Sequence, residues 1–71
     1  MRRSNVRNMT NPTLVTYARN QFRAYAKAKI LGEANYMAFH LATLTTALVE
    51  LDRRHIIVDA LPKLQELLDE Q

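Results

Sequence analysis

The sequence contains no cysteine, one glycine and two prolines among its 71 residues. Without cysteine no disulfide can stabilise the fold, and this absence is typical of a reducing compartment. So few turn-forming residues disfavour an all-β fold, which needs many tight turns. No apolar run approaches roughly 18 residues, and the basic first residues lead into a polar stretch, so neither a membrane span nor a signal peptide is predicted. We therefore expect a cytoplasmic protein built of helices.

Residue patterns typical of catalysis are also missing. A lone Gly32 cannot form a glycine-rich phosphate loop. His40 and His55 are not spaced as metal ligands and have no carboxylate cluster nearby. Asp52 lies one helical turn before His55, but such a pair without a nucleophile is no indication of catalysis. We expect a protein that is not an enzyme and that holds no cofactor and no metal.

The composition is that of an ordinary globular domain, with 48% hydrophobic and 24% charged residues. A chain this short buries only about 60% of the surface that its unfolded form exposes. Its core can then contribute only roughly 3–5 kcal/mol, and proteins of this size usually need an additional source of stability. Because disulfides are excluded and no metal site is indicated, we expect a homo-oligomer.

Local patterns divide the chain into a flexible basic arm at 1–10 and a single helical domain at 11–71. Asn11 is a good N-cap, and Pro12 suits the first helical position, so a helix is predicted over about 11–31. Gly32 should end it. Apolar side chains recur at steps of three and four along one face. They are Leu14, Val15, Ala18, Phe22, Tyr25 and Ala26.

The second half predicts two further helices, at about 34–54 and about 59–70. Spacings of four and three define a heptad seam on the first of them. The seam consists of Met37, Leu41, Leu44, Leu48 and Leu51. Asp59 is a plausible cap for the last helix, with Pro62 tolerated in its first turn; alternatively, the second helix continues and Pro62 kinks it near Val58. The fold class is all-α: an antiparallel helical hairpin completed to a three-helix bundle by the short third helix.

Charge is distributed unevenly along the chain. Residues 1–32 carry seven Lys and Arg and no acid, whereas residues 33–71 carry seven acids and three Lys and Arg. The first part therefore has a formal charge of +7 and the second of −4. Such a split favours a polyanionic partner for the first part, or packing between the two parts, although helices of small domains also differ in charge by chance.

The basic residues suggest contact with nucleic acid, whether DNA or RNA. Arg19, Arg23 and Lys27 share one helical face, and the arm could hold further phosphates. The candidate nucleic-acid-binding residues are Arg2, Arg3, Arg7, Arg19, Arg23 and Lys27. The function that follows is a small regulatory binding module, although a solvated polar face would give the same pattern.

A second surface offers an alternative function. Phe39 points away from the heptad seam and Tyr36 flanks it, so the two aromatics could contact a partner, unless the third helix or the arm covers them. The candidate partner or oligomer contacts are Tyr36, Phe39, Met37, Leu41, Leu44 and Leu48. The alternative is a protein–protein adaptor or inhibitor, of the kind that phage accessory genes encode, acting on a partner protein. The first helix also resembles an interfacial membrane helix, but we expect no membrane attachment, because its apolar face is needed for the core.

Overall fold

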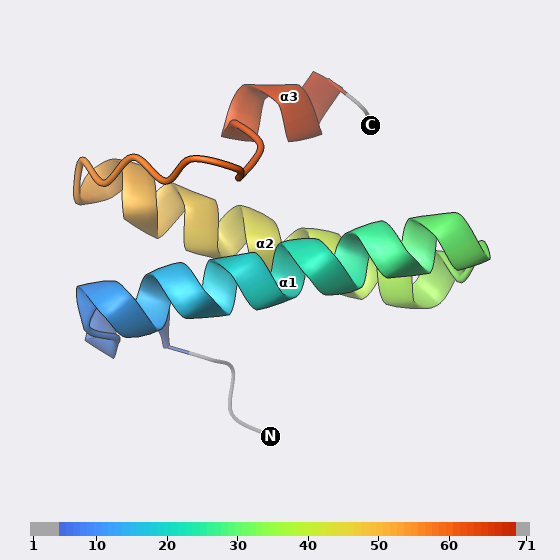
Figure 1. Cartoon of the computed structure of the whole chain (residues 1–71), viewed down its shortest axis with the longest axis horizontal. Coiled ribbons are helices and arrows are strands. Elements are labelled where there is room, and N and C mark those ends of the chain that lie inside the picture. Colours follow the sequence, from blue (N-terminus) through green and yellow to red (C-terminus); the bar gives the residue numbers. More distant parts are fainter. Residues whose placement is uncertain (1–4, 70–71) are drawn as a thin grey trace.

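The computed structural model describes residues 5–69, without the side chain of Leu68. In this part of the chain helices are the only regular structure: η1 (Val6–Asn8), α1 (Asn11–Leu31), α2 (Ala34–Arg53) and α3 (Leu64–Asp69). The helices α1 and α2 lie side by side and run antiparallel, and α3 packs against α2 (Figure 1). The predicted all-α architecture, with two long packed helices and a short third, is confirmed.

The ends of α1 show how local chemistry sets the length of this helix. Thr10, not Asn11, is its N-cap, and the Thr10 hydroxyl oxygen accepts a hydrogen bond of 3.4 Å from the Thr13 amide. The prediction of Asn11 was therefore wrong by one residue. At the other end, Gly32 adopts the left-handed conformation with a φ of 71°. The next amide, that of Glu33, donates to the Ala28 carbonyl at 2.9 Å and closes the helix.

The segment after α2 differs from the prediction. The helix α2 ends at Arg53, one residue before the predicted end, but α3 begins only at Leu64 and has six residues. Asp59 lies in a turn and caps no helix, and Pro62 precedes α3 instead of lying in its first turn. Two physical causes delay the helix: Ala60 is left-handed, with a φ of 72°, and a proline disfavours helical backbone at the residue before it. The alternative of a continuous, kinked α2 is also wrong.

The core lies between α1 and α2 and extends beneath η1 and α3. Leu14 from α1 and Leu44 from α2 are the largest side chains buried completely. The buried apolar residues around them come from all four elements. They are Val6, Ala18, Tyr25, Ala47, Leu48, Leu51 and Leu67. The heptad seam of α2 is thus used inside the molecule, because its three buried leucines belong to this core.

The predicted flexible arm at 1–10 is not confirmed. Residues 1–4 lie outside the described part of the chain. Within residues 5–10, η1 forms a short helical turn that packs on α2, and Val6 is only 8% exposed. Two apolar side chains, Val6 and Met9, are too few in a polar stretch to show a period, which is why the pattern predicted no structure here.

A polar contact links the two long helices. The Gln21 side-chain oxygen accepts hydrogen bonds from the Thr43 hydroxyl at 2.6 Å and from His40 Nδ1 at 2.9 Å. The three groups are partly buried and satisfy one another's hydrogen bonding, and they fix the register between α1 and α2.

Neither long helix, nor any other helix of the described residues, is long and apolar enough to cross a membrane.

Candidate nucleic-acid interface

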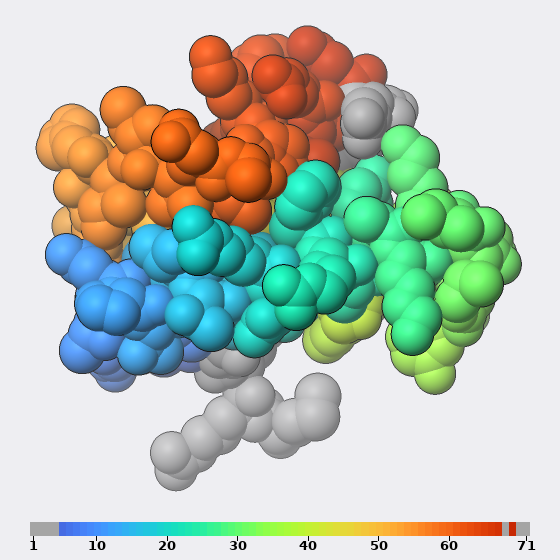
Figure 2. All heavy atoms as spheres, in the orientation of Figure 1, coloured from blue at the N-terminus to red at the C-terminus, as the bar shows by residue number. Residues whose placement is uncertain are grey.

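The outward side of α1 carries the basic row, defined as Arg19, Arg23 and Lys27. All three residues are exposed, whereas the opposite side of the helix supplies buried Ala18 and Tyr25 to the core. At about 100° per residue the row covers about 80° of the circumference, and at about 1.5 Å per residue it is about 12 Å long. No other element covers α1 on the face turned to the viewer in Figure 2.

The basic row is not neutralised within the part of the molecule that the structure describes. None of its three side chains forms an ion pair or hydrogen bond with a described residue. No acidic residue occurs anywhere in α1. The ion pairs found among described residues join α2 to itself or to its C-cap, so they do not connect the basic first part of the chain to its acidic second part. The row therefore presents its positive charge to solvent.

Polar groups suited to phosphate lie beside the row. Thr16 and Asn20 are exposed on the same side of α1. Together with Met9 and Tyr17 they line a shallow hollow of about 390 Å³ at the N-terminal half of the helix. A hydroxyl and an amide next to three cations can donate hydrogen bonds to phosphate oxygens or base edges.

The remaining predicted cations do not extend the row. Arg7 is exposed, but it belongs to η1, which packs against α2. Arg2 and Arg3 lie outside the described residues. The structure thus brings together three of the six predicted cations, all from α1.

Glu50 forms a charged network that the sequence reasoning missed. Its side chain is only 5% exposed, and it accepts hydrogen bonds from Arg53 Nε at 3.1 Å, Arg53 Nη2 at 2.6 Å and Arg54 Nε at 2.7 Å. The bonds from Arg53, followed by those from Arg54, lower the pKa of the carboxyl from 4.5 to about 2. The spacings of three and four residues on a helix were the available signal.

Arg54 also attaches η1 to the helical hairpin. Its Nη2 donates to the carbonyl oxygens of Val6 at 3.0 Å and Arg7 at 3.1 Å, and its Nη1 donates to the Asn11 side chain at 2.9 Å. These contacts join residues more than forty positions apart in sequence. Arg54 is therefore occupied within the fold and is not available as a phosphate ligand.

The predicted partner contacts separate into two groups. Tyr36 and Phe39 are 61% and 59% exposed, and neither α3 nor the described part of the N-terminal segment covers them. The ring of Phe39 instead meets that of His40 edge to face, with 5.2 Å between centroids. The four seam residues differ: Met37 and Leu41 are half-buried, and Leu44 and Leu48 are buried in the core.

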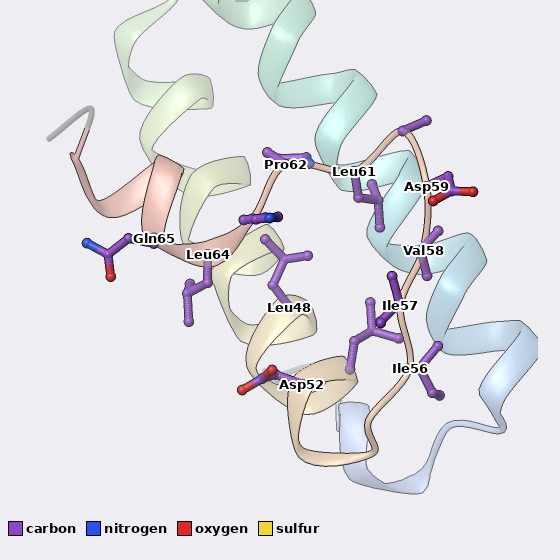
Figure 3. A pocket seen from close by; sticks show the side chains of 13 residues that line it. Leu48, Asp52, Ile56, Ile57, Val58, Asp59, Leu61, Pro62, Leu64 and Gln65 are labelled. Atoms are coloured by element: carbon purple, nitrogen blue, oxygen red, sulfur yellow. The ribbon is translucent and has the colours of Figure 1, made fainter.

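An open hollow of about 730 Å³ lies between α2, the 56–63 segment and the start of α3. Its wall is mostly apolar, with Leu48, Leu61 and Leu64 around it and Asp59 on the outer side of the segment (Figure 3). Among the described residues no group of three His, Cys, Asp or Glu could hold a metal ion. The hollow could therefore contact an apolar group, but the described residues place no cluster of polar side chains in it.

Comparison with known proteins finds no family model that matches the chain, no curated protein of significant sequence similarity and no solved structure of significant structural similarity.

Proposed function

We propose that this protein is a small non-catalytic regulatory module that binds nucleic acid through the outward side of α1. The observation that supports this proposal is the basic row: three exposed cations, aligned on one rigid helix and unpaired with any described residue. A solvated polar face usually mixes both signs of charge, whereas α1 carries no acid at all.

Binding would begin with the phosphates. B-DNA carries one negative charge per about 1.7 Å of its axis, so a row of about 12 Å always has several phosphates within reach. Three neutralised phosphates release counterions and give a salt slope of roughly −2.7, which weakens binding about 40-fold between about 50 and 200 mM salt. Thr16 and Asn20 add hydrogen bonds that orient the helix on the backbone.

The test is fluorescence anisotropy of a labelled DNA duplex and a labelled single-stranded RNA, titrated with protein over a series of salt concentrations. The variant R19Q/R23Q/K27Q removes the row and keeps residues of good helix propensity. We expect it to lose most of the affinity and nearly all of the salt dependence. Its matched control, K63E/Q65E, makes the same change in net charge at exposed positions outside α1 and should bind with at least half the wild-type affinity.

Two outcomes would overturn the proposal. Undiminished binding by the triple variant, with its helical circular dichroism intact, would move the interface away from α1. No binding by the wild-type protein at low salt, where charge attraction is strongest, would leave the cations as a solvated face. In the second case the alternative of a protein–protein adaptor or inhibitor gains support, because Tyr36 and Phe39 are exposed apolar contacts on α2.

A further inference from the structure

The outward side of α2 has an unusual composition for an exposed helix surface. No Asp, Glu, Lys or Arg occurs between Ala34 and Val49. The exposed residues at successive turns on this side form a surface that we call the α2 face. It consists of Asn35, Ala38, Phe39, Ala42, Thr46 and Val49. A helix at the surface normally carries charged residues on its solvent-exposed side, as α1 does. The α2 face carries none, so no hydrated charge stabilises its exposure to water.

Burial of the α2 face would cost little desolvation free energy. The Thr46 hydroxyl already donates to the Ala42 carbonyl at 3.0 Å, so burial leaves this donor satisfied. Ala42 lies near the centre of the face and Ala38 one turn before it, where small side chains let a second helix approach closely. Phe39 and Val49, 59% and 50% exposed, belong to the same face and can fill the space between two helices.

Within the described part of the molecule nothing covers this face. Both η1 and α3 pack against α2, yet all six residues of the face stay exposed. The core that the described residues build is small, because among them only Leu14 and Leu44 are large side chains with an exposure below 2%. A further apolar contact would therefore add a substantial share of the stability of so short a chain.

We propose that the α2 face binds a second copy of this chain, with the two α2 helices antiparallel. A second copy presents an equally uncharged surface, so no buried charge is left without a partner. Contact through α1 would instead bring two basic rows together. The C-terminal end of α2 selects the orientation, because Arg53, 60% exposed, lies about five helical turns after Asn35 and therefore on the same side as the α2 face.

The antiparallel register keeps the two copies of Arg53 apart. A two-fold axis at Ala42 sets Ala38 opposite the partner's Thr46, and the helix dipoles oppose one another. A parallel pair would place the two Arg53 side chains together at one end. One helix pair buries less than the roughly 1,600 Å² of a standard interface, so we expect a dimer of roughly micromolar affinity.

The first test is sedimentation equilibrium of the full chain, without nucleic acid, from about 1 to 500 μM. The wild type should pass from monomer to dimer across this range. A42E places two carboxylates at the two-fold axis and should raise the dissociation constant at least about tenfold. T13E introduces the same residue at an exposed position of α1 and should dimerise as the wild type does. Circular dichroism confirms that both variants remain folded.

The second test is disulfide cross-linking, which the absence of native cysteine makes unambiguous. Under mild oxidation A38C mixed with T46C should yield covalent dimers joining the two variants, whereas A38C alone should not, because its two sulfurs would lie about 12 Å apart along the axis. Efficient cross-linking of A38C alone would overturn the antiparallel arrangement. A wild-type monomer throughout the range, or a dimer indifferent to A42E, would overturn the α2 face as the site of self-association.

Discussion

Glu50 shows how a single buried charge can organise this chain. A carboxylate withdrawn from water is costly unless hydrogen bonds and opposite charge replace its hydration. Here two guanidinium groups surround it, and one of them, that of Arg54, continues to the carbonyl oxygens of η1. The carboxylate fixes the position of Arg54, and Arg54 in turn fixes the N-terminal segment. The charge state of one side chain is thereby linked to the attachment of a separate element.

This link predicts an acid-sensitive stability. The pKa of Glu50 is lowered from 4.5 to about 2 by its bonds to Arg53 and Arg54. A group with a lowered folded-state pKa contributes stability that is present above about pH 4.5 and is lost as the pH falls towards 2. We expect the melting temperature, followed by circular dichroism, to decline across this window. E50Q should melt at a lower temperature at pH 7 and show a shallower decline.

A matched control comes from α3, where Glu66 is exposed. E66Q should melt close to the wild-type temperature at pH 7 and keep the steep acid decline. An E50Q protein as acid-sensitive as the wild type would show that other carboxyl groups set the response.

Residue-level prediction succeeded where the chemistry is local. Gly32 was recognised because a left-handed helix end is a property of one residue. Asn11 was misassigned as the N-cap although the cap is local, because Thr10 directly before it is an equally suitable N-cap residue and accepts from the Thr13 amide. The burial of Val6, in contrast, depends on where Arg54, 48 positions away, holds η1. No pattern of neighbouring residues contains that contact, so the sequence alone suggested an unstructured arm.

At the scale of elements, the hairpin and α3 should differ in stability. The α1 and α2 helices have 21 and 20 residues and bury Leu14 and Leu44 completely between them. In contrast, α3 has six residues, too few for an isolated helix, and depends on packing of Leu67, which is 2% exposed. Such an element can detach while the hairpin stays folded.

We therefore predict unequal effects of two leucine truncations. L44A removes a side chain that has no exposed surface and should lower the free energy of unfolding by about 2–5 kcal/mol, measured by urea denaturation. L67A should lower the free energy of unfolding by less, because it removes only packing that holds α3 against the hairpin. Hydrogen exchange should show faster exchange of α3 amides than of α2 amides in the wild type. Equal losses of unfolding free energy and equal protection from exchange would instead show that α3 and the hairpin unfold as one cooperative unit.

The boundaries of the elements were predictable to the extent that periodicity reports them. Seam leucines at steps of three and four identified α2 as a helix, and its predicted end at about residue 54 lies one residue beyond the observed end at Arg53. For α3 the pattern of leucines was correct, but Leu61 precedes the helix, because Ala60 is left-handed and Pro62 follows. The place where the seam packs could not be predicted for a related reason. The sequence gives the spacing of the seam and not what covers it, and the seam leucines pack inside the chain, whereas the predicted contact Phe39 stays exposed on the opposite side of α2.

At the scale of the whole molecule, the basic row and the α2 face lie on the outward sides of two helices that pack against each other. A dimer formed through the α2 face would therefore have the helix order α1, α2, α2 and α1, with a basic row on each outer surface. Neighbouring helix axes are about 8–10 Å apart, which separates the two α1 axes by roughly 27 Å. The two rows face opposite directions, so one straight duplex cannot contact both.

The consequence, which depends on both proposals above, is that the dimer bridges two duplexes. Mixing donor-labelled and acceptor-labelled duplexes with protein above the dimer dissociation constant should give energy transfer that excess unlabelled duplex abolishes. A42E should still bind each duplex in the anisotropy assay but should fail to bridge them, while R19Q/R23Q/K27Q should do neither. Bridging by A42E at wild-type levels would mean that each monomer carries two separate nucleic-acid sites, because a single outward row on an isolated hairpin cannot hold two duplexes at once.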